Sequence, residues 1–209
     1  MNQEELAQWF DANKTLLETA YLAGQQPWQQ SGVGLHTQRT AADWETLRRP
    51  IADCVDRSGS FLDIGCANGY LLECLLLWVN ECGLIIDPYG LDLSEKLVEL
   101  AKKRLPHFAH HLYVGNAWTW IPPQTFDYVR TELVYVPPEL HQQFVSLLLE
   151  RYLNPRGRLL IAEYRGRQQT APTVTIDSYL TNMGFTVRHV KVGVLDGMEQ
   201  TRIAVVEKD

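Results

Sequence analysis

The sequence predicts an α/β fold around a mostly parallel sheet, and two patterns support this prediction. From about residue 57 onward, short apolar runs of strand length alternate with segments of helical periodicity. Such alternation is typical of strand–helix–strand crossovers, which place helices on both faces of a parallel sheet. Further along the chain, two apolar runs flank Asp196-Gly197, a pair that favours a tight turn between antiparallel strands. We therefore expect one seven-stranded sheet whose last two strands form a hairpin.

The individual elements follow from the spacing of apolar residues and from local capping signals. Strands are expected at residues 61–64, 90–93, 112–114, 126–129, 158–162, 185–194 and 201–207. Helices are expected at residues 70–79, 95–105, 139–152 and 176–183. Ser94 is suited to cap the second of these helices, and Pro138 fits the first turn of the third. Gly184 ends the last helix.

The first 55 residues have a different character and predict a helical cap or lid. Residues 4–23 form an amphipathic helix with apolar residues on one face at Leu6, Phe10, Leu17 and Tyr21. Residues 25–39 contain Pro27, Gly32 and Gly34 and have no period, so we expect a loop there. A second helix begins at Thr40, and Pro50 interrupts it. We interpret residues 1–55 as the cap and residues 56–209 as the main domain.

The composition is that of a globular domain. Of 209 residues, 45% are hydrophobic and 21% are charged, which disfavours disorder, and the net charge of −6 disfavours generic electrostatic binding to nucleic acid. No apolar run reaches the roughly 18 residues of a membrane span, and no signal-peptide pattern is present, so we expect a cytoplasmic protein. The four cysteines lack zinc-ligand spacing, and we expect them to be reduced, mostly buried and free of metal.

A glycine-containing turn follows the first expected strand. It reads Asp63-Ile64-Gly65-Cys66-Ala67-Asn68-Gly69. Glycine permits positive φ and close approach of a ligand, and the helix that follows offers unpaired N–H groups. In open α/β sheets, such a turn is typical of a nucleotide-binding site at the carboxyl ends of the strands. The alternative is a tight turn that binds nothing.

The next two strands end in residues that suit an adenosine. Asp92 ends the second strand, where a carboxylate accepts hydrogen bonds from both ribose hydroxyls, although it could instead cap the following helix. Asn116 and Ala117 follow the third strand, where an amide could bond the edge of an adenine. Trp118 offers an aromatic face there, with core packing as the alternative.

Taken in order, these motifs resemble the class I S-adenosylmethionine-dependent methyltransferases. The resemblance covers about residues 56–209 and includes Phe126-Asp127-Tyr128-Val129 in the fourth strand and the turn and strand at residues 153–160. It implies a three-layer, Rossmann-like, seven-stranded, mostly parallel sheet with an antiparallel terminal strand, and S-adenosyl-L-methionine as the cofactor. Asn116 departs from the commoner Asp, but its amide oxygen can accept from an adenine amino group. The implied cofactor contacts are Asp63, Gly65, Cys66, Ala67, Asn68, Gly69, Asp92, Leu93, Asn116, Ala117, Trp118 and Arg130.

The rival class is a dinucleotide-dependent oxidoreductase. That class expects Gly-x-Gly-x-x-Gly, whereas this turn has Gly65 and Gly69 separated by three residues. The spacing therefore favours methyl transfer over hydride transfer.

Methyl transfer requires alignment of the nucleophile with the methyl group, and a base only where an oxygen or nitrogen must lose a proton. Glu132, just beyond the fourth strand, is the first candidate for a proton acceptor or substrate orienter, with Tyr135 nearby. The alternative is that Glu132 only pairs with Arg130. His36 is a second candidate base, and the alternative there is a solvated loop residue.

Three arginines, Arg130, Arg165 and Arg167, follow the fourth and fifth strands and are expected at the pocket rim. Because arginine suits carboxylate and phosphate, we hypothesise an anionic acceptor held by at least one of them, with solvated loop arginines as the alternative. Tyr21 and Trp28 flank the N-terminal loop, and with Arg165 they are the expected substrate-binding residues.

The sequence thus predicts methyl transfer from S-adenosyl-L-methionine to a small-molecule acceptor through an oxygen or nitrogen nucleophile. Methylation of RNA or protein is an alternative enzyme activity. A cofactor-binding protein without turnover is an alternative of another class. Neither the acceptor nor the oligomeric state follows from the sequence.

Overall fold

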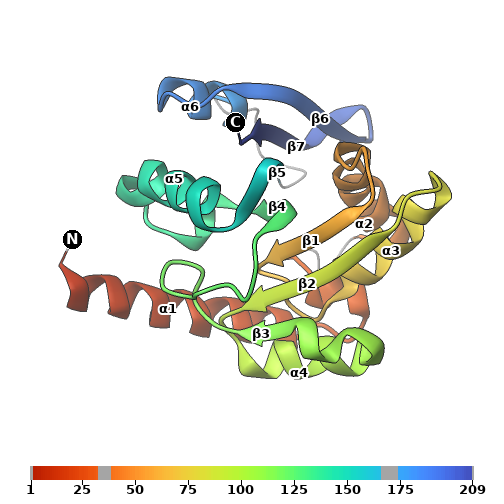
Figure 1. Cartoon of the computed structure of the whole chain (residues 1–209). Coiled ribbons are helices and arrows are strands. Elements are labelled where there is room, and N and C mark those ends of the chain that lie inside the picture. Colours follow the sequence, from red (N-terminus) through yellow and green to blue (C-terminus); the bar gives the residue numbers. More distant parts are fainter. Residues whose placement is uncertain (1, 33–38, 166–173, 209) are drawn as a thin grey trace.

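The computed structural model describes residues 2–32, 39–165 and 174–208 and contains the expected seven-stranded sheet (Figure 1). The strand order is β3-β2-β1-β4-β5-β7-β6. The five parallel strands are β1 (Gly59–Ile64), β2 (Ile86–Asp92), β3 (Leu112–Val114), β4 (Phe126–Thr131) and β5 (Leu153–Tyr164). β7 (Met198–Glu207) lies antiparallel between β5 and β6 (Val187–Leu195). The fold class predicted from the sequence is confirmed.

Helices cover both faces of this sheet. The α-helices are α1 (Gln3–Leu22), α2 (Ala41–Arg48), α3 (Tyr70–Glu81), α4 (Glu95–Arg104), α5 (His141–Arg151) and α6 (Ile176–Asn182). Short 3₁₀ helices are η1 (Pro27–Gln30), η2 (Arg49–Cys54), η3 (Pro106–His111), η4 (Leu133–Tyr135) and η5 (Pro138–Leu140). Side chains of α2, α3 and α4 share one core cluster with one face of the sheet, and those of α5 and α6 share a second cluster with the other face.

Alternation along the strands separates the two clusters. Phe61 and Leu160 belong to the α3 side, whereas Leu62 and Leu159 belong to the α5 side, and all four side chains are fully buried. Successive strand residues point to opposite faces, so each strand contributes to both clusters. This is the three-layer arrangement that the alternating sequence pattern predicts.

Several element boundaries differ from the prediction: β2 begins at Ile86 rather than at residue 90, and β7 at Met198 rather than at residue 201. Two further differences have a local cause. The helix expected at residues 139–152 is divided into η5 and α5, because the Leu140 N–H bonds the Pro137 carbonyl in a 3₁₀ turn before the α-helix begins. The fifth strand begins at Leu153 rather than at residue 158, since Leu153 pairs with Phe126 before an irregularity interrupts the pairing. Apolar periodicity does not reveal either feature.

The N-terminal residues do not behave as one cap. In α2 and η2, Trp44 and Ile51 are fully buried and belong to the α3 side of the core. α1 instead runs past the carboxyl ends of β1 and β2 (Figure 1), and its N-terminus carries a capping box between Asn2 and Glu5. The division at residue 55 therefore remains a prediction.

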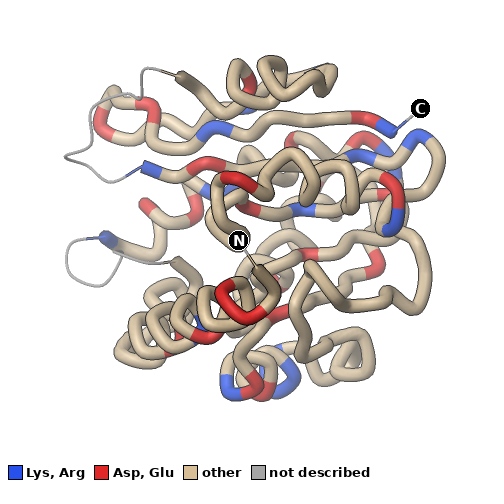
Figure 2. The backbone as a smooth tube through the Cα atoms, turned by 90° about the vertical axis from the view of Figure 1, so that its left-hand side faces the viewer, with Lys and Arg blue, Asp and Glu red and all other residues tan. Residues whose placement is uncertain are grey.

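Three of the four cysteines are buried, as expected. Cys54, Cys66 and Cys74 are buried free thiols, and Cys82 is an exposed one. None of the helices within the described ranges has the length and apolarity needed to traverse a bilayer. Figure 2 shows acidic and basic residues interspersed along the backbone in that view.

Candidate active site

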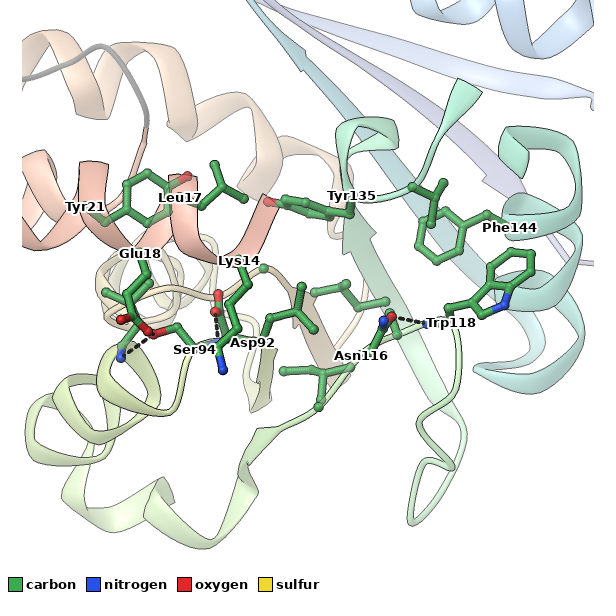
Figure 3. A pocket seen from close by; sticks show the side chains of 18 residues that line it. Lys14, Leu17, Glu18, Tyr21, Asp92, Ser94, Asn116, Trp118, Tyr135 and Phe144 are labelled. Atoms are coloured by element: carbon green, nitrogen blue, oxygen red, sulfur yellow. Dashed lines mark hydrogen bonds between the residues drawn. The ribbon is translucent and has the colours of Figure 1, made fainter. Parts of the chain in front are cut away.

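A first cavity of about 590 Å³, partly open to solvent, lies under α1 at the carboxyl ends of β1, β2 and β3 (Figure 3). Among the residues that line it are Lys14, Leu17, Glu18, Tyr21, Gly65, Asp92, Leu93, Asn116, Ala117, Trp118 and Tyr135. The motifs that the sequence analysis took from three different strands therefore come together in one place, as parallel topology requires.

Asp92 holds the glycine turn and faces this cavity. Its carboxylate accepts from the backbone N–H of Ala67 and from that of Ser94, both at 2.9 Å. Ser94, not Asp92, caps α4, because the Ser94 hydroxyl accepts from the Leu97 N–H. Burial raises the pKa of Asp92 above its usual range. Each carboxylate oxygen keeps a further lone pair, so the group suits the ribose hydroxyls.

Asn116 can offer a donor in addition to the acceptor oxygen that was expected. Its Oδ1 atom already accepts from the Trp118 backbone N–H at 2.9 Å, which makes the amide NH₂ the part without a hydrogen bond among the described residues. An NH₂ donor suits a ring nitrogen of an adenine. Trp118 is half-buried, lining this cavity while also packing against the α5 side of the core.

Only part of the glycine motif reaches a cavity. Gly65 (φ +79°) and Gly69 (φ +74°) both have positive φ, but only Gly65 lines the site. Cys66 is buried against Gly90, where an added Cβ would lie 2.8 Å from its sulfur. The Asn68 amide donates to the Pro27 carbonyl and to Gln30, so this side chain fastens η1 to the turn.

A second cavity, of about 920 Å³ including space open to solvent, adjoins the first at the ends of β1, β4 and β5. The two cavities share Leu17, Tyr21, Gly65 and Tyr135. The remaining lining residues of the second are Ser31, Gly32, Arg48, Asp63, Ala67, Leu71, Arg130, Glu132, Val134 and Tyr164.

Arg130 connects three adjacent strands at the floor of this second cavity. Its guanidinium donates to Asp63 at 3.1 Å, to Glu132, and to the Tyr164 hydroxyl at 3.0 Å. The side chains of Arg130 and Asp63 are 4% and 1% exposed. Because two carboxylates neutralise Arg130, the predicted pairing with Glu132 is present, and this arginine has no charge left for an anionic ligand.

Asp63 keeps one oxygen free of protein partners. Its Oδ2 atom is buried and has no hydrogen bond within the described ranges. Burial raises the pKa of Asp63 to about 6, against the opposing effect of Arg130. A buried acceptor without a donor is unfavourable unless a ligand supplies one.

Two residues of the second cavity were missed by the sequence analysis. Arg48, in the last turn of α2, is 6% exposed, and its guanidinium lies 3.4 Å from the centre of the Tyr164 ring. Residues 2–32, 39–165 and 174–208 supply it with no carboxylate and no hydrogen-bond acceptor, so its positive charge is buried without an anion. The packing of α2 on β6 and β7, next to the end of β5, brings Arg48 and Tyr164 together.

Of the other predicted site residues, some line a cavity and some do not. Glu132 and Tyr135 lie together, because the Tyr135 hydroxyl donates to Glu132 at 3.1 Å. Burial raises the pKa of Tyr135 and Tyr21, so both hydroxyls remain protonated donors. Arg165 pairs with Glu163 and Glu199 and lines neither cavity.

The remaining predicted residues are Trp28, His36 and Arg167. Trp28 packs against the α3 side of the core and lines neither cavity. His36 and Arg167 lie outside the described residues.

Several solved structures with a similar fold are described as methyltransferases. The magnesium protoporphyrin IX methyltransferase of Synechocystis, solved with bound S-adenosylmethionine, has a TM-score of 0.62 at 16% identity and covers 96% of this chain and 97% of its own. A methyltransferase from Aquifex aeolicus has a TM-score of 0.58 at 18% identity, over 81% and 94% of the two chains. One from Thiobacillus denitrificans, in complex with S-adenosyl-L-homocysteine, has a TM-score of 0.51 at 20% identity, over 78% and 71%.

The fold and the first cavity thus define a class I methyltransferase. A family model described as "Methyltransferase domain" matches residues 56–203, and the chain belongs to that family. The comparison with curated proteins found no match. The family resemblance in the sequence is confirmed: the protein is an enzyme of methyl transfer, and S-adenosylmethionine is the cofactor of this family.

Proposed function

We propose that this enzyme methylates a small molecule, with the adenosine of S-adenosylmethionine in the first cavity and its amino-acid end in the second. One observation supports the proposal most. Asp63 Oδ2 is a buried oxygen without a hydrogen bond among the described residues, and Arg48 is a buried guanidinium that stacks on Tyr164 and forms no ion pair with a described carboxylate; both residues line the second cavity. An α-amino acid carries one ammonium and one carboxylate, which match these two groups in number and sign.

When bound, S-adenosylmethionine would supply the methyl group of its sulfonium. The chain's own residues would then act as binders. Asp92 accepts from the ribose, Asn116 donates to the adenine, Asp63 accepts from the α-ammonium and Arg48 donates to the α-carboxylate. With these contacts the nucleoside and the amino acid are held on opposite sides of Gly65.

For the acceptor, we propose Glu132 as the residue that orients it and takes its proton. The Glu132 Oε1 atom accepts from Arg130 and Tyr135, whereas Oε2 has no partner among the described residues, and the side chain lines the second cavity. An O–H or N–H group suits such an oxygen. Because Arg130 is neutralised and Arg48 is assigned to the cofactor, we favour a neutral or cationic acceptor over the anionic one first hypothesised.

We propose that α1 is the lid of the first cavity. Lys14, Leu17, Glu18 and Tyr21 line it from this helix. Glu18 accepts from the Ser94 hydroxyl at 2.6 Å and pairs with Lys96 at 2.7 Å, which fastens α1 to the start of α4. Removal of these contacts would open the path to Asp92.

The test is calorimetric titration with S-adenosyl-L-homocysteine, S-adenosylmethionine and decarboxylated S-adenosylmethionine. Arg48→Leu is expected to weaken binding of the first two by about 10- to 100-fold, the range for a hydrogen bond to a charged group. Binding of the decarboxylated ligand should not change, because that ligand offers Arg48 nothing to bind.

Two variants control this experiment. Arg49→Leu removes the next arginine, which is exposed and pairs with Glu81, and it should leave all three affinities unchanged. Asp92→Ala should weaken all three ligands alike. Equal losses for all three ligands in Arg48→Leu would contradict the assignment of this residue, and no binding to the wild type would contradict the proposed function.

A further inference from the structure

Tyr135 lies directly on the glycine turn. A Cβ atom added to Gly65 would lie 2.2 Å from the Tyr135 hydroxyl and 2.3 Å from the Cζ atom of its ring. The tip of the tyrosine therefore fills the space immediately above Gly65. Figure 3 shows Tyr21 and Tyr135 reaching toward one another with their hydroxyl groups, Tyr21 from α1 and Tyr135 from the end of η4.

The space above Gly65, which Tyr135 fills, lies at the border between the two cavities. Gly65 and Tyr135 line both of them, Asp92 lines only the first, and Asp63 lines only the second. A ligand that reaches from Asp92 to Asp63 must pass over Gly65. Two groups cannot occupy the same volume at the density of a protein interior, so such a ligand and the tyrosine ring exclude each other there.

The Tyr135 side chain also forms a hydrogen bond with Glu132. The Tyr135 hydroxyl donates to Glu132 Oε1 at 3.1 Å, the oxygen that also accepts from Arg130. Tyr135 is the last residue of a three-residue 3₁₀ turn, and its N–H bonds the Glu132 carbonyl at the long distance of 3.5 Å. Rotation of this side chain therefore breaks one side-chain hydrogen bond and no regular secondary structure.

We propose that Tyr135 has two positions, and that it leaves the one over Gly65 when the cofactor enters. The inference rests on the proposed function. In the position described here, Tyr135 separates the cavities and bonds Glu132. In the other position, the path over Gly65 is open and Glu132 Oε1 is free of the tyrosine. Binding of the cofactor thus leaves Glu132 Oε1 bonded to Arg130 alone, beside the Oε2 atom that is proposed to meet the acceptor.

The test compares two aromatic residues of the site by titration with S-adenosyl-L-homocysteine. Tyr135→Ala is expected to bind about 3- to 10-fold more tightly than the wild type, because a competent form that was a minor population becomes the only one. Trp118→Ala, which removes an aromatic side chain lining the first cavity alone, is expected to bind more weakly because it loses a contact surface. The two substitutions should change affinity in opposite directions.

Stopped-flow fluorescence gives a second readout that does not depend on activity. In the wild type, rotation of Tyr135 breaks a single hydrogen bond and is fast compared with ligand binding, so the observed rate should rise linearly with ligand concentration, with a slope reduced by the population of the open position. In Tyr135→Ala, the slope should be about 3- to 10-fold larger, in line with the change in affinity. Tyr135→Phe keeps the ring but loses the bond to Glu132, and its slope should lie between those of the other two. Far-ultraviolet circular dichroism checks that each variant is folded.

The outcomes separate this inference from the proposed function. If Tyr135→Ala and Trp118→Ala both weaken binding, Tyr135 is a contact residue and the inference is wrong, whereas the proposed function stands. Tighter binding by Tyr135→Ala, with faster association, supports both. If neither the wild type nor Tyr135→Ala binds S-adenosyl-L-homocysteine or S-adenosylmethionine, the proposed function fails and the inference fails with it.

Discussion

The two cavities of the site are built from different kinds of groups. The first is lined mainly by apolar side chains, with the carboxylate of Asp92 and the amide of Asn116 at the strand ends and the charged Lys14 and Glu18 on α1. The second gathers Arg48, Arg130, Asp63 and Glu132 within a single lining. The first cavity resembles a binding slot for a nucleoside, whereas the second is an arrangement of charges that must balance. A substitution in the first cavity should therefore affect only the contacts of the residue that is replaced. A substitution in the second should also change the stability of the neighbouring charged groups.

The largest effect is expected from Arg130→Met, which tests whether the charged groups of the second cavity depend on one another in this way. The substitution leaves Asp63 and Glu132 without their shared cation, and removing one member of a buried ion pair lowers the free energy of unfolding by about 3–5 kcal/mol. Urea denaturation followed by circular dichroism measures this change.

Arg165→Met is the matched control for that prediction. Arg165 is also largely buried and also pairs with two glutamates, but Glu163 and Glu199 are 27% and 30% exposed and remain solvated without it. We expect a clearly smaller loss of stability. Equal losses in the two variants would contradict the distinction between the cavity and an ordinary ion-pair cluster.

An intermediate effect is expected from pH. Because burial raises the pKa of Asp63 to about 6, this carboxylate becomes protonated as pH falls through that value and loses its attraction for an α-ammonium. Binding of S-adenosyl-L-homocysteine should weaken below pH 6, approaching about tenfold per pH unit, while it stays constant above pH 7. Calorimetry between pH 5 and 8 measures the affinity.

The comparison ligand for the pH series is 5′-methylthioadenosine, which lacks the amino-acid end and is expected to bind only the first cavity. Its affinity should vary much less with pH over this range. Asp63→Asn should abolish the pH dependence of S-adenosyl-L-homocysteine binding. A parallel decline for both ligands would assign the titration to the first cavity instead.

The smallest effect is expected at the edge of the first cavity, from Lys96→Ala. Lys96 is 69% exposed and pairs with Glu18 of α1, and exposed ion pairs contribute only about 0–1 kcal/mol. Dissociation of S-adenosyl-L-homocysteine should accelerate by no more than about fivefold, the rate equivalent of 1 kcal/mol. Lys102→Ala removes a pair to Glu99 on the same helix but away from the cavity, and it should leave dissociation unchanged.

The sequence predicted the fold and the first cavity because both depend on local patterns. Gly65, Asp92 and Asn116 each end or follow a strand, and parallel topology brings such positions to one edge without further information. Asp63 and Glu132 were also predicted, for the same reason.

The second cavity depends on side-chain direction and on contacts between distant segments. Arg165 was expected at the rim, but Tyr164, one residue earlier, lines the cavity, and neighbouring strand residues point to opposite faces. Arg48 lies in a helix whose position over Tyr164 is set by packing of Trp44 and Ile51. Neither the direction of Arg165 nor the role of Arg48 is encoded in a motif.

The antiparallel insertion of β7 between β5 and β6 has a consequence for the order in which the molecule is completed during synthesis. β5 carries the site residue Tyr164 at its end, and its second edge is paired only by residues 158–164 against Thr201 to Glu207. A growing chain that has emerged as far as residue 195 therefore presents β5 with one unpaired edge, a surface prone to join other chains. The hairpin must be complete before β5, the strand that carries Tyr164, is paired on both sides, and until then its open edge is available to other chains.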